Sequence, residues 1–271
     1  MKFPKPRLIV ILLLLCGWIG IPSPAEEAST GFFAGGASEI SSDDPERALK
    51  AIRKWSGSGE GEVRKSLLET PYFWDFEKIG RPVFLRILKN SNRGGLLEVW
   101  LENNASGIFE YFKSYQIAYF SGALGPKTRE GDLQAPEGFY TISRGRLNPQ
   151  SNYHLSMDIG YPNSYDLAKG RTGNLLMIHG KAFSIGCFSI TDSSIEQIYT
   201  LVDAALGNGQ SFVRVHCFPF AMTGRMMEVH DDSEHHEFWG NLKEGWDWFQ
   251  EHRRPPEVTV EDGRYHFGAD R

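Results

Sequence analysis

Hydrophobic and polar positions alternate along much of the chain from residue 84 onward, which is the pattern of β-strands with one buried face. This alternation predicts strands at 84–88, 96–101, 107–119, 139–142, 153–159 and 212–218, the last ended by Pro219, and an edge strand at 258–260. A continuous apolar run predicts a short buried strand at 175–178. In the segment 107–119, residues of one parity are expected to share a face: Phe109, Tyr111, Tyr115, Ile117 and Tyr119. Closely spaced strands with polar turns predict a β-rich sandwich or barrel.

Helical spacing of apolar positions marks a smaller part of the sequence. It predicts two short helices within 43–70, a helix from Asp192 to Leu206, and a C-terminal helix whose aromatic face contains Phe238, Trp239, Leu242, Trp246 and Phe249. Strands and helices together predict an α+β fold of β-rich character with flanking N- and C-terminal helices. Residues 121–140 are dense in glycine and proline, so they predict an irregular loop that either lines a site or connects two strands at the surface.

The N-terminus has the three parts of a secretory signal. Lys2, Lys5 and Arg7 give a positive start, Leu8 to Ile21 is an apolar run, and Ser23-Pro24-Ala25 supplies small residues. We therefore expect a signal peptide cleaved after Ala25, and export of the mature chain to the periplasm or cell envelope. An uncleaved membrane anchor is the alternative, although the apolar run is short against the roughly 20 residues of a spanning helix.

Composition and charge exclude some classes of function. The 271 residues carry a net charge of -5, and 41% hydrophobic and 23% charged residues are ordinary for a globular protein. The chain lacks the blocks of Lys and Arg that bind nucleic acid, so we expect no nucleic-acid partner. The acidic and histidine-rich stretch 230–237 is interpreted as a solvated helix start, because the adjacent His235 and His236 point apart on a helix; no metal site is predicted.

A histidine and a cysteine follow each other closely at the ends of two predicted strands. The apolar strand 175–178 leads into His179-Gly180, and Ser184-Ile185-Gly186 leads to Cys187, after which the chain is extended again. A cysteine is nucleophilic as its thiolate, and a nearby imidazole supplies the base or the charge that makes one. Gly186 lets the backbone approach a bound carbonyl, so amides at Gly186 and Cys187 are candidate oxyanion donors. The alternative is a cysteine that packs inertly between apolar neighbours.

The same stretch resembles the L,D-transpeptidases, cysteine enzymes that remodel bacterial peptidoglycan. Their signature is a His-Gly followed by Ser/Thr-His-Gly-Cys, an apolar residue, and Arg or Asn. Here Ile185 replaces the second histidine, as in the YafK-like branch of the family, and Ser189 replaces Arg or Asn. The resemblance covers roughly residues 80 to 225, and further blocks carry it: 125–127, 130–132, 134–140, 160–163, 165–166, 170–173 and 216–220.

The resemblance implies a role for several residues and a domain organisation. Cys187 would be the nucleophile, His179 the proton donor and acceptor, Gly186 the oxyanion backbone, and Ser184 a residue that orients His179 or the loop. Arg171, Tyr161 and Asn163 would bind substrate. A diaminopimelate stem presents carboxylates that arginine binds, and the tyrosine is expected to pack on a sugar or the stem peptide; a structural ion pair is the alternative for Arg171. The domains expected are a signal peptide at 1–25, a flexible lead-in and helical appendage at 26–78, a catalytic domain of L,D-transpeptidase type at 79–225, and a C-terminal helix and tail at 226–271.

Three functions remain open at this point. The first is acyl transfer through a cysteine thioester at the diaminopimelate of peptidoglycan stem peptides, without a cofactor. The second uses the same cysteine to hydrolyse, releasing a stem or an envelope protein attached to peptidoglycan. The third is a non-enzymatic peptidoglycan-binding module. Cys217 lies on the strand 212–218 and is interpreted as a core residue, while its pairing with Cys187 is left open.

Overall fold

The computed structural model describes residues 78–90 and 94–269, and its larger sheet has five strands. These are β1 (Val83–Asn90), β2 (Leu96–Glu102), β3 (Phe109–Gln116), β4 (Gly138–Ile142) and β9 (Val213–Phe220), in the order β3-β2-β1-β9-β4. Within this sheet the β1–β9 pair is parallel and the other three pairs are antiparallel. The predicted signal peptide, the lead-in and the helices within 43–70 lie outside the described residues.

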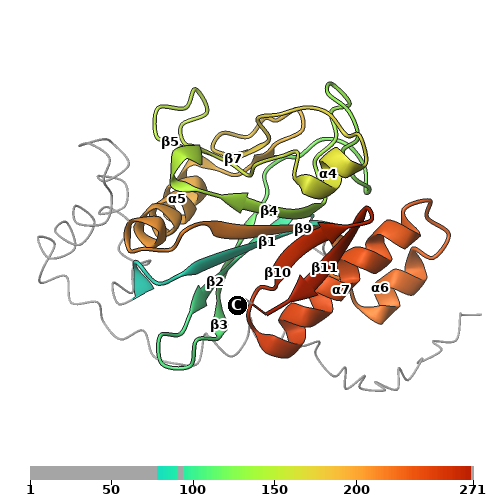
Figure 1. Ribbon diagram of the computed structural model, residues 1–271. Coiled ribbons are helices and arrows are strands. Elements are labelled where there is room, and N and C mark those ends of the chain that lie inside the picture. Colours follow the sequence, from blue (N-terminus) through green and yellow to red (C-terminus); the bar gives the residue numbers. More distant parts are fainter. Residues whose placement is uncertain (1–77, 91–93, 270–271) are drawn as a thin grey trace, which may run out of the picture. The chain divides into compact units, whose positions relative to one another are not determined.

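A smaller sheet and the helices complete the described part (Figure 1). The smaller sheet has the order β5-β6-β7-β8, with β5 (Leu147–Asn148), β6 (Ser156–Asp158), β7 (Met177–His179) and β8 (Phe188–Ser189). A separate hairpin pairs β10 (Glu257–Glu261) with β11 (Arg264–Gly268). The helices are the 3-10 turn η3 (Arg144–Arg146), α4 (Ser164–Ala168), α5 (Asp192–Gly207), α6 (Gly224–Val229) and α7 (His236–His252). The α+β class is confirmed, and the strands described here form open sheets rather than a closed barrel.

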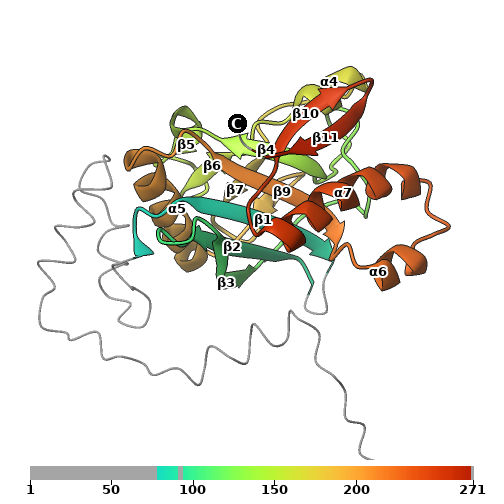
Figure 2. The same ribbon diagram turned by 60° about the horizontal axis from the view of Figure 1, so that its bottom comes forward.

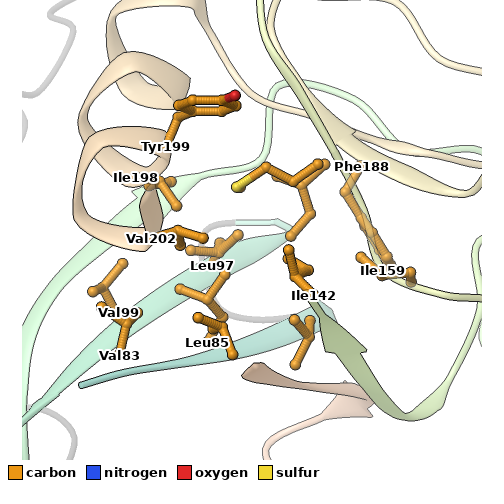
Figure 3. Close-up of a cluster of buried hydrophobic side chains, with 14 of the residues drawn as sticks. Val83, Leu85, Leu97, Val99, Ile142, Ile159, Phe188, Ile198, Tyr199 and Val202 are labelled. Atoms are coloured by element: carbon orange, nitrogen blue, oxygen red, sulfur yellow. The ribbon is translucent and has the colours of Figure 1, made fainter. Parts of the chain in front are cut away.

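The five-stranded sheet is buried on both faces, which explains why every residue of β1 except the last is buried. On one face, side chains of the large sheet pack against the smaller sheet and α5, as Figure 3 shows for Leu85, Phe188 and Val202. On the other face, Phe218 and Phe220 pack with Trp239 and other residues of α7 and the hairpin. Figure 2 shows α7 beside β10 and β11, away from α5.

Strand β3 corrects the expectation that residues 109–119 keep one parity. A bulge lies between the pairs Val99–Lys113 and Trp100–Tyr111, so one extra residue of β3 faces its partner strand. The bulge moves Phe109 to the aromatic cluster around Phe249, whereas Tyr115 stays in the core with α5. The prediction of a single face was therefore wrong, because a bulge reverses the alternation and leaves no mark in the hydrophobic pattern.

One further expectation needs correction at the C-terminal side, and two elements there were not predicted. Strand β9 does not end at Pro219 but continues to Phe220. Its pairing with β4 ends earlier, where Cys217 lies opposite Gly138, the first residue of β4, so Pro219 lies beyond that pairing. A proline is tolerated where a strand has an unpaired edge. The helix α6 and the strand β11 are present without having been predicted.

No helix among the described residues is long and apolar enough to span a membrane.

The buried His216 predicts acid sensitivity of the fold. Its ring lies 4.6 Å from that of Phe84 and 4.7 Å from that of Phe139, and its Nδ1 has no hydrogen-bond partner among the described residues. Burial, with the charges of Arg214 and Arg86, lowers the pKa of His216 well below its usual value. The unfolded chain therefore binds a proton below about pH 6.5 that the folded chain does not, and stability falls as pH decreases, by up to about 1.4 kcal/mol per pH unit.

We expect the free energy of unfolding, measured in urea, to fall less steeply between pH 7.5 and 5 in His216→Phe than in wild type. This fall in stability with decreasing pH is called the acid limb below. The exposed His266 offers the matched control, and His266→Gln should leave the limb unchanged. An acid limb that is equally steep in wild type and His216→Phe would contradict the assignment to His216.

Candidate active site

The parallel pair β7–β8 brings His179 and Cys187 to one face of the smaller sheet. Ile178 pairs with Phe188, and both side chains are buried in the core. Because side chains alternate along a strand, His179 at the end of β7 and Cys187 directly before β8 lie on the opposite face from these two. By the same register Cys187 lies opposite Met177, whose N–H donates to its sulfur, so the predicted imidazole and the predicted thiol lie on adjacent strands with an offset of two residues.

Backbone groups of the residues leading into β7 surround the Cys187 sulfur. The N–H of Met177 donates to Sγ at 3.3 Å, and the thiol points to the carbonyl of Leu175 at 3.7 Å. The residue is half-buried, and burial raises the pKa of the Cys187 thiol although the N–H of Met177 acts to lower it. The sulfur is thus partly accessible and held in place by main-chain atoms.

His179 is buried and has a defined tautomer. Its Nδ1 lies 2.6 Å from the carbonyl oxygen of Gly180, and a carbonyl oxygen only accepts, so Nδ1 carries the proton and Nε2 holds the lone pair. The ring of Tyr153 packs against the imidazole with 4.6 Å between centroids. Burial lowers the pKa of His179 and raises that of Cys187, so the imidazole and the thiol are both neutral at rest.

These pKa directions predict how Cys187 reacts with a thiol reagent. Because only the thiolate reacts, the alkylation rate should keep rising as pH increases through and above the ordinary thiol pKa of about 8.5, without a plateau at acidic pH. Cys217 is fully buried and burial raises the pKa of its thiol, so it should react far more slowly. Peptide mapping of iodoacetamide-treated protein between pH 6 and 10 measures both rates. A plateau already at pH 6 would instead indicate a standing thiolate–imidazolium pair.

The two residues predicted to support the nucleophile shape its loop. Gly186 has φ +110, in the region that favours glycine, and a Cβ there would make only ordinary contacts, so the conformation rather than the space requires glycine. The Ser184 hydroxyl donates to the carbonyl oxygen of Cys187 at 2.8 Å. Of the two predicted tasks for Ser184, this contact favours orienting the loop over orienting His179.

The glycine- and proline-rich loop lies beside the nucleophile. A Cβ at Gly186 would be 3.6 Å from the carbonyl oxygen of Gln134, which places this part of the loop against the cysteine segment. Within the loop, Lys127 and Asp132 form an ion pair, and the Asp132 carboxylate also accepts the N–H groups of Thr128, Arg129 and Gln134. These contacts lower the pKa of Asp132 to about 2. The loop is therefore ordered by its own ion pair where it faces Cys187.

The three residues predicted to bind substrate all have internal partners. Arg171 donates to Asp166 at 2.8 Å and lies over the rings of Tyr165 and Phe238, which supports the structural alternative that the sequence left open. The Tyr161 hydroxyl bonds carbonyl oxygens of the chain, at 3.3 Å for that of Thr172. Asn163 caps α4 and donates to the Phe139 carbonyl and the Tyr265 hydroxyl. Their role toward a substrate stays a prediction.

The structure also places residues that the sequence analysis did not connect with the site. Tyr153 against His179 is one, and the carbonyl of Leu175 near the sulfur is another. Spacing gave no signal for either, because both contacts arise from loops that precede their strands. Cys217 is a buried core residue, as predicted, and both Cys187 and Cys217 are free thiols. No cluster of three potential metal ligands occurs in the described ranges.

Comparisons with known proteins identify the family of the chain. The L,D-transpeptidase catalytic domain family (YkuD) matches residues 99–228. The proteins named "Putative L,D-transpeptidase YafK" from Escherichia coli K12 and O157:H7 are both 40% identical over 207 residues, which is 76% of this chain and 82% of the relative. The chain therefore belongs to the L,D-transpeptidase family, whose enzymes act on peptidoglycan.

Solved structures with a similar arrangement are more distant. The helical cell shape determining protein Pgp2 from Campylobacter jejuni matches with a TM-score of 0.39 and 19% identity, over 68% of this chain and 77% of that one. Bd1075 from Bdellovibrio bacteriovorus matches with a TM-score of 0.34 and 18% identity, over 65% of this chain and 60% of that one. The family assignment rests on the sequence comparisons.

Proposed function

We propose that this protein is a cysteine acyltransferase that acts at the diaminopimelate of peptidoglycan stem peptides through a thioester on Cys187. The observation that carries the proposal is the β7–β8 pairing, in which the half-buried Cys187 directly precedes the strand next to the one that ends in His179. The lone pair on Nε2 of His179 supports its role as the proton acceptor. Family membership supports the substrate class. The predicted signal peptide supports export to the cell envelope, where this substrate lies.

In the proposed reaction, Nε2 of His179 takes the proton of Cys187 as Sγ attacks the carbonyl carbon that follows an L-centre of the stem. The carbonyl oxygen becomes an oxyanion, for which the backbone amides at Gly186 and Cys187 are the proposed donors. The tetrahedral intermediate then expels the amine, which takes the proton from His179 and leaves a thioester on Sγ. An amine or a water molecule, deprotonated by His179, attacks this thioester and restores the thiol.

The acceptor decides which product forms. With an amine, the stem is joined to a second stem or to a protein, and with water the acyl group is released as a carboxylate. Incubation of the purified mature chain with peptidoglycan that carries tetrapeptide stems and attached envelope proteins, followed by mass analysis of the muropeptides, separates these outcomes. New cross-links support transfer, while shortened stems or released proteins support hydrolysis. Binding to peptidoglycan without any change in the muropeptides would support the non-enzymatic module and overturn the proposal.

A further inference from the structure

The peptide bond between Gly180 and Lys181 connects His179 to a carboxylate. Its carbonyl oxygen accepts Nδ1–H of His179 at 2.6 Å, and its N–H donates to Oδ1 of Asp192 at 2.7 Å. The C=O and N–H of a trans peptide point in opposite directions, so the imidazole and the carboxylate lie on opposite sides of one planar group. We propose, building on the function proposed above, that Asp192 is a positioning residue that holds and polarises this peptide for His179.

The backbone around this peptide leaves room for the carboxylate of Asp192. A Cβ at Gly180 would lie 2.6 Å from Oδ1 of Asp192 and 2.7 Å from the carbonyl oxygen of Tyr153, so only glycine fits there. Lys181 has φ +64, which is a conformation that side chains other than glycine rarely adopt. The N–H of Gly180 donates to the carbonyl of Leu155 at 3.1 Å and fixes the preceding peptide. An unfavourable conformation that persists at such a place requires the surrounding bonds to hold it.

Asp192 is placed for this contact by the start of α5. It is the first residue of the helix, and the preceding Thr191 makes no side-chain cap bond. The carboxylate reaches back to the segment that joins His179 to the nucleophile rather than to the helix amides, as its bond to the N–H of Lys181 shows. A negative charge is also favoured at a helix N-terminus.

The contact should matter most when His179 carries a second proton. Hydrogen bonds in a chain polarise one another, so the carboxylate makes the Gly180 carbonyl a stronger acceptor for Nδ1–H. A stronger acceptor stabilises the imidazolium that forms as Cys187 is deprotonated. The same bond fixes the orientation of the ring, with Nδ1 bound to Gly180 and Nε2 left to accept the proton from Cys187 in the proposed reaction. Asp192 does not touch the substrate in this arrangement, so its effect falls on the chemical step.

The test compares Asp192→Ala and Asp192→Asn with wild type. We expect Asp192→Ala to lower kcat on the order of ten-fold with little change in KM, the lower end of the effect seen when hydrogen-bond partners behind metal-ligating histidines are removed. The pH curve of Cys187 alkylation should shift to higher pH in the same variant. Asp192→Asn retains an oxygen acceptor for the Lys181 N–H and should recover most of kcat, leaving the loss of charge as the remaining difference.

Glu237→Gln is the matched control, because it removes an acidic residue from the first turn of another helix, α7. It should leave kcat and the alkylation curve unchanged. The inference is overturned if Asp192→Ala changes only thermal stability, or if it lowers kcat without moving the alkylation curve. Failure of the proposed function is distinguishable, since muropeptide turnover would then persist in Cys187→Ala, whereas failure of this inference leaves Cys187→Ala inactive and Asp192→Ala fully active.

Discussion

Cys187→Ala is expected to abolish turnover of peptidoglycan stems, lowering kcat at least about 10^4-fold, while the protein remains folded. Loss of a nucleophile that forms the covalent intermediate removes the reaction path itself, and such losses are among the largest measured for single substitutions. The side chain is half-buried and small, so its removal costs little packing. Muropeptide analysis with purified variant measures the loss, and circular dichroism with urea unfolding measures the fold.

Two further variants make this prediction specific. Cys217→Ala removes the other thiol of the described chain, which is fully buried in the core, and should lower stability but leave kcat near the wild-type value. Cys187→Ser keeps the size but places a poor nucleophile beside a neutral imidazole and should also be inactive. Turnover that survives in Cys187→Ala, or that is lost equally in Cys217→Ala, would contradict the assignment of the nucleophile.

Lys89→Met is expected to lower the free energy of unfolding by about 3–5 kcal/mol, the largest stability effect predicted here. The side chains of Lys89 and Glu137 are fully buried and form an ion pair at 3.0 Å. Nζ of Lys89 also donates to the carbonyl oxygens of Gly125 and Ala135, and Glu137 accepts Nε1–H of Trp239. Burial lowers the pKa of Lys89, but methionine leaves the Glu137 carboxylate and two carbonyl groups without this partner.

The double variant Lys89→Met with Glu137→Gln tests the cause. Removing both charges eliminates the uncompensated carboxylate, so the double variant should regain at least half of the stability lost in Lys89→Met. Lys243 pairs with Asp247 on the exposed side of α7 and provides the control, since Lys243→Met should change stability by less than about 0.5 kcal/mol. Urea unfolding measures all three. A cost for Lys89→Met no larger than that for Lys243→Met would show that the buried pair contributes little.

The buried pair also shows what a sequence can and cannot reveal about this fold. Strands β1, β2 and β9 follow the alternation of apolar residues, and α5 follows helical spacing up to its glycine-rich end, so these elements were predictable. The bulge in β3 and the continuation of β9 through Pro219 depend on which strand lies next to which. The pairing of Lys89 with Glu137 depends on the same tertiary arrangement, and Lys89 appears in the sequence as an ordinary polar position.

The residues of the candidate site also fall into those that the sequence could predict and those that it could not. His179 and Cys187 were recognisable because the residues around them carry a family signature, with His179 at the end of one short strand and Cys187 directly before the next. Arg171, Tyr161 and Asn163 belong to equally recognisable blocks, yet their polar atoms bond to Asp166 and to main-chain groups. A recognisable block therefore does not distinguish a residue that holds the site together from one that contacts substrate. The carboxylate of Asp192 behind His179 depends on a loop conformation that no spacing rule describes.

Intact-mass and peptide-mapping spectrometry of the enzyme, quenched in acid during turnover of tetrapeptide stems, tests the central claim most directly. We predict an added mass equal to the acyl part of the stem, located on the peptide that contains Cys187, labile to hydroxylamine and absent from Cys187→Ala. Turnover that proceeds at the same time with unmodified Cys187, or with the added mass on another residue, would contradict it.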